Sequence, residues 1–138
     1  MKKIVVPGIN IQWPWSQLLL SGKKTVETRG YELPAKHVGK PLVIIETAGP
    51  RGKKEAGIDR ARIVGLIVFR SSFQYQSNSH WRKDHNRHLV DVDDPMFAWG
   101  KSNERWGWEV ESVKVIEPHQ NAPKKKGIVF TSACTISI

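Results

Sequence analysis

Runs of apolar residues alternate with short polar or glycine-containing breaks along most of the chain, and this pattern predicts a sheet. The runs are rich in valine and isoleucine, which favour strands. A turn at Pro7 and Gly8 interrupts the first run. We expect six strand segments, at residues 4–11, 24–29, 42–47, 61–71, 106–117 and 128–138.

One helix is predicted between the first two strands. Pro14 suits a first helical turn, because its missing N–H would have no partner there, and Gly22 suits the left-handed residue that ends a helix. Between them, Trp15, Leu18 and Leu19 form one apolar stripe. We expect this stripe, including Trp15, to pack in the core.

A second helix is expected from about residue 80 to just before residue 90, with Ser77 or Ser79 as its N-cap. The basic, glycine-containing segment 50–57 is expected to be a mobile surface loop. With no internal repeat and no domain boundary, the chain is predicted to be one domain over residues 1–138. Its class is α+β, a β-rich barrel of five or six strands with two or three short helices.

Polar and charged residues alternate in segment 24–29, unlike in the other strands. Strand geometry sends one set to each face: Thr25, Glu27 and Arg29 to the first, and Lys24, Val26 and Thr28 to the second. Burying isolated charges costs many kcal/mol. We therefore expect the face with Glu27 and Arg29 to border an open cleft; the alternative is a solvated strand after a capped helix.

Charge and aromatic content favour a polyanionic partner. The net charge is +9 at pH 7, and six tryptophans exceed the needs of so small a core. Trp106 and Trp108, two residues apart in one strand, are expected in that core, which leaves other aromatic rings free to stack on bases. A basic protein that is merely soluble is the alternative.

Other features of the sequence indicate a cytoplasmic protein without membrane association. Cys134 is a single cysteine and cannot form an internal disulfide, and we identify no secretory signal and no apolar run long enough to span a bilayer. His80, His85 and His88 lie near Asp84, but no second pair of ligands accompanies them, so we expect a basic, histidine-bearing helix beside the cleft and not a metal site. We predict no metal and no cofactor. The oligomeric state is not predicted.

The stretch from residue 13 to residue 31 resembles the signature of the ASCH domain family, within the PUA-like superfamily of small β-barrels. The resemblance is carried by Trp13-Pro14-Trp15, Leu18-Leu19, the run from Ser21 to Arg29, and Tyr31. The core G-x-K-T-x-E-x-R matches in residue type and spacing, and weaker similarity extends over nearly the whole chain. The resemblance implies a single ASCH domain with a small PUA-like mixed β-barrel.

The resemblance also implies binding of RNA, with single-stranded DNA or a free, modified nucleotide as alternatives. The cleft would lie between the first helix and the strand at 25–29. We expect Trp13 to stack on a base, Lys24 and Arg29 to hold phosphate or carbonyl oxygens, and Glu27 to contact a base edge. The candidate binding residues are Trp13, Lys23, Lys24, Thr25, Glu27, Arg29, Tyr31, Arg70 and Trp99.

Enzymes with a similar cleft make hydrolysis a second possibility. Some remove the acetyl group of acetylcytidine with a lysine, a threonine nucleophile and a downstream glutamate; Lys24 matches the lysine, but Glu27 occupies the threonine's position. Ribonuclease activity would use Glu27 as a base beside Lys24 and Arg29. Lys24 and Glu27 are thus the candidate catalytic pair. A protein-interaction module, with an exposed apolar patch, is the third possibility.

Overall fold

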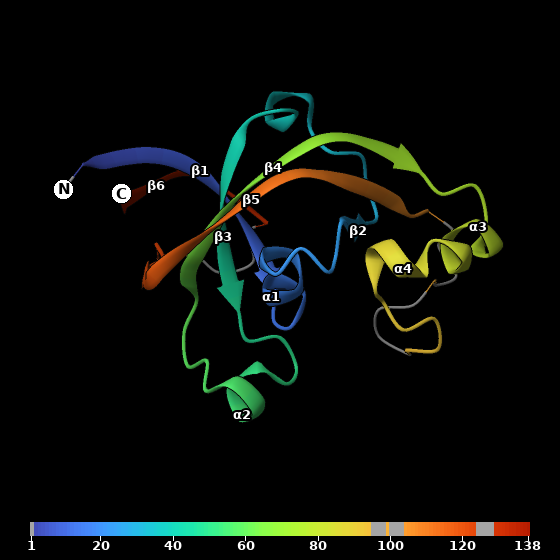
Figure 1. Cartoon of the computed structure of the whole chain (residues 1–138), viewed down its shortest axis with the longest axis horizontal. Helices are drawn as coiled ribbons and strands as arrows, with labels where there is room; N and C mark the ends of the chain where they lie inside the picture. Colours follow the sequence, from blue (N-terminus) through green and yellow to red (C-terminus); the bar gives the residue numbers. More distant parts are fainter. Residues whose placement is uncertain (1, 95–98, 100–103, 124–128) are drawn as a thin grey trace.

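One six-stranded sheet dominates this computed structural model, which describes residues 2–94, 99, 104–123 and 129–138 (Figure 1). The strands are β1 (Lys3–Gln12), β2 (Val26–Arg29), β3 (Pro41–Thr47), β4 (Arg62–Gln74), β5 (Trp106–Asn121) and β6 (Phe130–Ser137). The helices in the described residues are α1 (Trp15–Leu20), α2 (Gly52–Ala56), α3 (Asn78–Lys83), α4 (His85–His88) and the short 3-10 helix η1 (Ala35–His37).

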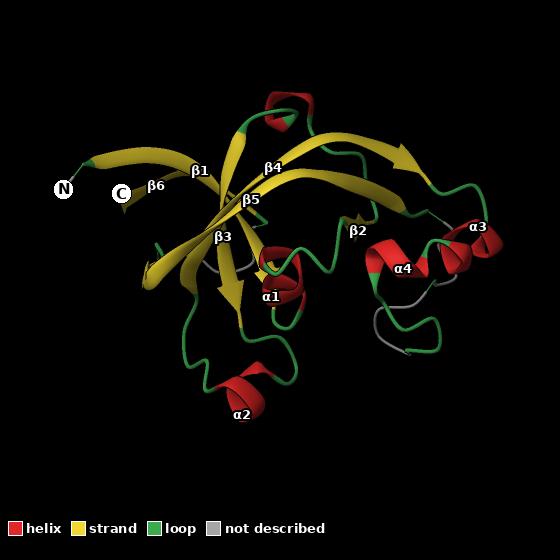
Figure 2. Ribbon diagram, in the orientation of Figure 1, coloured by secondary structure: helices red, strands yellow, loops and turns green. Residues whose placement is uncertain are grey.

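The strand order in the sheet is β2-β5-β4-β3-β1-β6. β1 pairs with β3 in parallel, and the other neighbouring pairs are antiparallel. Figure 2 shows α1 against the middle of the sheet, while α3 and α4 lie together near the ends of the long strands β4 and β5. The predicted α+β fold with six strands is confirmed, and it carries four short α-helices in the described residues instead of two or three.

The observed sheet differs from the predicted barrel in one respect, because the sheet is not closed into a barrel. β2 and β6 are its two edges, and within the described residues neither pairs with the other. β2 has four residues, and α4 lies along it, since the Thr25 N–H donates to the Arg87 carbonyl at 2.9 Å. On the other side of the opening, the Arg29 side chain reaches the Asn10 carbonyl of β1 at 2.9 Å. A side chain therefore crosses the gap that a backbone ladder would close.

The core confirms the expected place of Trp108 and most of the α1 stripe. Trp108 and Leu19 are fully buried, among isoleucine, leucine and phenylalanine side chains of β1, β3 and β4. Trp106 is partly buried against the same cluster. Trp108 makes edge contacts with Phe69, and its Nε1 donates to the Tyr31 carbonyl at 3.1 Å.

Glu46 fixes the position of α1 on the sheet. Its fully buried carboxylate accepts hydrogen bonds from Ser16 Oγ at 2.7 Å and Gln17 Nε2 at 2.7 Å. Arg62 Nε of β4 donates to the same carboxylate at 2.8 Å. A buried carboxylate is tolerated when its oxygens are paired in this way. These bonds set the orientation of α1 and hence of Trp15.

Two helix predictions need correction. Segment 50–57 contains α2, which ends at Gly57, where a φ of 67° suits glycine, and which is held by the buried Ile58. The helix expected at 80–90 is two helices, α3 and α4, separated at Asp84. The Ser77 cap is confirmed, because its Oγ accepts from the His80 N–H at 3.1 Å. In the described residues, no helix is long and apolar enough to cross a membrane.

The Glu46 network predicts a large effect of removing one partner. Arg62→Met leaves the buried carboxylate without its cation, and we expect the free energy of unfolding to fall by about 3 kcal/mol. Urea denaturation measures the change, with Arg60→Met, at an exposed position two residues away, as the matched control. Equal stability of the two variants would contradict the role assigned to Glu46.

Candidate functional site

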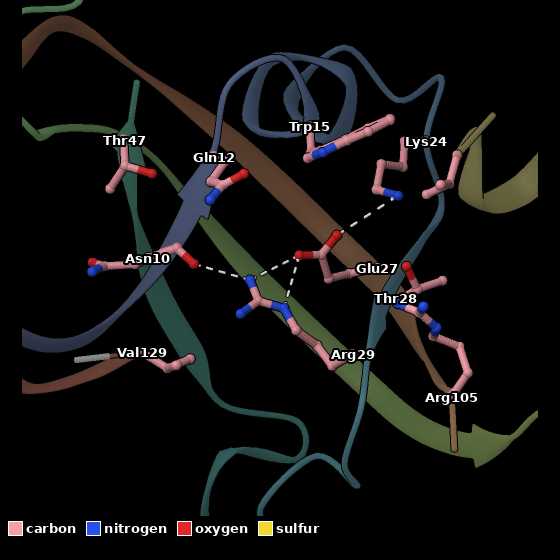
Figure 3. A pocket seen from close by; sticks show the side chains of 11 residues that line it. Asn10, Gln12, Trp15, Lys24, Glu27, Thr28, Arg29, Thr47, Arg105 and Val129 are labelled. Atoms are coloured by element: carbon pink, nitrogen blue, oxygen red, sulfur yellow. Dashed lines mark hydrogen bonds and ion pairs between the residues drawn. The ribbon is translucent and has the colours of Figure 1, made fainter. Parts of the chain in front are cut away.

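A cavity of about 380 Å³ opens in the unclosed gap between β1 and β2 (Figure 3). Residues of β1, β2, β3 and α1 contribute to it, together with the segment after α4. The described residues that line it are Asn10, Gln12, Trp15, Lys24, Glu27, Thr28, Arg29, Thr47, Val90, Arg105 and Val129. The sequence-predicted Lys24, Glu27 and Arg29 are therefore brought together.

Lys24 is buried in the wall of this cavity, with 1% of its surface exposed. It precedes the first residue of β2, so strand alternation does not govern its side chain, which lies on the same side as Glu27. Its Nζ donates to the His88 carbonyl, lies 3.6 Å from Glu27 Oε1, and is 5.0 Å from the centroid of the Trp15 ring. Burial lowers the pKa of Lys24 to about 8, although Glu27 opposes the change.

Glu27 pairs with two of the three cations of the described wall, Lys24 and Arg29. Its Oε2 accepts from Arg29 Nε at 3.0 Å and Nη2 at 2.8 Å, while its Oε1 faces Lys24. The Arg29 guanidinium also lies 5.6 Å from the centroid of the Trp108 ring. With Arg105 as a third cation and Glu27 as the carboxylate, the described wall carries two positive charges when Lys24 is protonated. Glu27 thus holds the cations in place, and its Oε2 is occupied by Arg29.

The segment after α4 completes the site, which the sequence did not reveal. His88 is fully buried and stacks on Trp81, with ring centroids 4.6 Å apart. Its Nδ1 accepts from the Val90 N–H at 2.9 Å, so its Nε2 carries the proton and donates to the Trp81 carbonyl at 2.8 Å. Burial lowers the pKa of His88 to about 4, so the ring is neutral. Leu89 has a positive φ of 60°, and this turn directs the His88 carbonyl and Val90 toward the cavity.

The indole that lines the cavity is Trp15, not Trp13. The Trp13 ring lies against Arg51, 5.8 Å from its guanidinium carbon, and Trp13 is not among the described residues of the cavity wall. Trp15, predicted to be core, packs partly on the core and presents its remaining surface to the cavity. The helical stripe gave the correct orientation of Trp15 toward the sheet, but not the opening beside it.

The other predicted binding residues lie outside the described wall of the cavity. Lys23 and Thr25 are exposed. Tyr31 packs edge-on against Trp108, with ring centroids 5.6 Å apart. Arg70 forms an ion pair with Glu109, with 3.7 Å between Nη2 and Oε2. The ring centroid of Trp99 lies 6.4 Å from that of Trp81, in the apolar cluster around α3. These residues do not gather at the cavity.

Most of the described lining residues were missed or misplaced by the sequence, among them Thr28, Gln12 and Thr47. Thr28 lines the cavity, although alternation placed it on the opposite face. Gln12 and Thr47 are register partners at the carboxyl ends of the parallel strands β1 and β3. Polar residues at the ends of two apolar runs are the signal that could have indicated them. No group of three or more potential metal ligands occurs among the described residues, and His88 is engaged on both ring nitrogens.

The buried Lys24 predicts a pH-dependent stability. Its pKa is about 8 in the folded chain, against an ordinary value of 10.5, so the unfolded chain binds more protons between these pH values. Stability should therefore rise from about pH 8 to pH 10.5 relative to Lys24→Met, by on the order of 1–3 kcal/mol. Denaturant titrations across this range measure it. Lys23→Met, beside it but exposed, should follow the wild type; the same pH response in Lys24→Met would contradict the assignment.

Comparison with solved structures identifies the fold. A crystal structure of ASCH from Zymomonas mobilis matches with a TM-score of 0.63 and 17% identity, covering 83% of this chain and 72% of that chain. A Ser-to-Ala variant of that protein matches with a TM-score of 0.67 at 16% identity, covering 91% and 86%, and a Tyr-to-Phe variant with 0.61 at 18%, covering 81% and 73%. No family model and no curated protein sequence matches the chain. The chain therefore has an ASCH-like fold, a small α+β fold, as the signature at residues 13–31 predicts.

Proposed function

We propose that this chain binds RNA, or a free or modified nucleotide, by accepting one base in the cavity between β1 and β2. The observation that carries the proposal is the placement of the Trp15 ring beside Lys24 and Arg29 in one cavity. Bases stack on aromatic rings, and cations attract phosphate or carbonyl oxygens. The cavity volume of about 380 Å³ falls within the range of roughly 300–1,000 Å³ of small-molecule sites.

Electrostatics supports a ligand with anionic character. The described cavity wall has three cations and one carboxylate, and the whole chain has a net charge of +9. A field of this sign raises the local concentration of polyanions. The buried Lys24 and the partly exposed Arg29 are held by Glu27 and by backbone carbonyls, so this part of the positive wall is arranged before a ligand arrives.

Salt titration tests this proposal. With roughly four phosphates contacted, the logarithm of the affinity for labelled single-stranded RNA should fall against the logarithm of salt with a slope near −3. Trp15→Leu should weaken binding by about 5- to 100-fold, the effect of losing one base stack. Trp13→Leu is the matched control, because Trp13 lies outside the described cavity wall.

Three results would count against the proposal. An affinity that does not change with salt concentration would contradict a polyanionic ligand. Equal loss of affinity in Trp13→Leu and Trp15→Leu would contradict the cavity as the binding site. Salt-insensitive capture of a protein would favour an interaction module. Circular dichroism of each variant separates loss of binding from loss of fold.

Hydrolysis is a second candidate, favoured by the lowered pKa of Lys24. With a pKa of about 8, the amine is partly neutral near pH 7, and it lies 3.6 Å from Glu27 Oε1. A partly neutral amine beside a carboxylate can exchange protons with a substrate such as an acylated nucleoside or a ribose hydroxyl. Glu27 is less available, because Arg29 holds its Oε2 with two hydrogen bonds.

Incubation with acetylcytidine and with RNA tests hydrolysis directly. The hydrolase proposal expects turnover by the wild type, a loss of at least about 100-fold in Glu27→Gln, as for a general acid or base, and no change in Glu32→Gln, an exposed control. Absence of turnover in the wild type, or equal turnover in both variants, would contradict it.

A further inference from the structure

Three of the four charged side chains of the described cavity wall, Lys24, Glu27 and Arg29, are paired with one another. Lys24 donates to the His88 carbonyl, and Glu27 Oε2 accepts two hydrogen bonds from Arg29. Arg29 Nη2 also donates to the Asn10 carbonyl. These groups supply a positive field, and part of their hydrogen-bonding capacity is used within the wall. An uncharged polar group of the cavity can add selectivity among bases to this field.

Gln12 is such a group. Its side chain is exposed and, within the described part of the chain, makes no hydrogen bond. Figure 3 shows its amide between the Trp15 ring and the Thr47 side chain, facing the cavity. Thr47 is its register partner on β3, so two strands fix the backbone on which both side chains stand. The Gln12 amide is exposed to water, so it incurs no desolvation cost while it lacks a hydrogen-bond partner in the protein.

The chemistry of an amide distinguishes the two purines where they present the edge that carries N7. Gln12 offers one acceptor, Oε1, directly beside one donor, Nε2. Adenine presents the complementary pair on one edge, its N6 amino group and N7, whereas guanine presents two acceptors, O6 and N7, on the same edge. A purine also covers more of the Trp15 ring than a pyrimidine does.

We propose that Gln12 selects adenine as the base that this cavity accepts, with Oε1 accepting from N6 and Nε2 donating to N7. The inference rests on the proposed nucleotide-binding function and adds a specificity-determining residue to it. Trp15 stacks on the ring, and the Lys24 and Arg29 wall attracts the remaining acceptor atoms or a phosphate. Adenine in an RNA strand and a free adenine nucleotide share this chemistry.

Calorimetric titration with the four nucleoside 5′-monophosphates measures the preference. A bidentate contact discriminates by about 5- to 100-fold, so AMP should bind more tightly than GMP by that factor. Gln12→Ala should reduce the ratio to near unity while leaving CMP and UMP affinities nearly unchanged. Gln76→Ala, at an exposed position outside the described cavity wall, should behave as the wild type.

The outcomes separate this inference from the proposed function. Equal wild-type affinity for the four nucleotides, or an AMP preference that survives in Gln12→Ala, overturns the role of Gln12 while nucleotide binding stands. Absence of binding by any nucleotide and by pentaribonucleotides overturns both. A pentaribonucleotide with one adenosine among uridines, compared with pentauridylate, distinguishes the two sources: a preference in the strand alone assigns adenine within RNA, and a preference in AMP as well assigns the free nucleotide. Gln12 is exposed, so its variants should retain the wild-type circular dichroism spectrum.

Discussion

The carboxylate of Glu27 is the interaction on which the organisation of the site depends. It lies between two cations that would otherwise be buried close to each other, 3.6 Å from Lys24 Nζ and 2.8 Å from Arg29 Nη2. Like charges in a low-dielectric setting repel strongly, and each would lose its hydration without a partner. Because Glu27 neutralises one of them, Arg29 can extend to the Asn10 carbonyl and connect β2 with β1. The same contact that stabilises the cations therefore joins the two sides of the cavity.

The cavity also depends on a distant part of the chain. α4 provides the backbone carbonyl that receives Lys24, 64 residues away in the sequence. Its position is fixed by Arg87, which bonds to Asp84 at 2.6 Å and to Glu109 of β5 at 2.9 Å. The sheet, α1 and α4 thus each contribute one side of the site. A change in the Arg87 network would act on Lys24 without touching the cavity.

The sequence predicts the strands for a clear physical reason, and it also predicts Lys24, Glu27 and Arg29 as residues of the site. Runs of β-branched residues have few alternatives to a strand, and alternation within β2 correctly places Glu27 and Arg29 together. Lys24 lies before the strand begins, so the same rule gives the wrong face for it. The distinction between Trp13 and Trp15, and the open gap itself, depend on tertiary contacts. The His88 carbonyl leaves no side-chain signal at all, because backbone groups are identical at every position.

The link between β1 and β2 has a consequence for how the molecule can change. The gap is spanned by a guanidinium group and not by a ladder of backbone hydrogen bonds. Its width can therefore change through side-chain rotamers while the sheet stays intact. Residues on its rim, such as Gln12 and Thr47, lie outside the buried clusters that hold the fold together. Substitutions at these rim positions can change which ligand is bound with little loss of folding stability, whereas substitutions in the buried clusters would destabilise the fold.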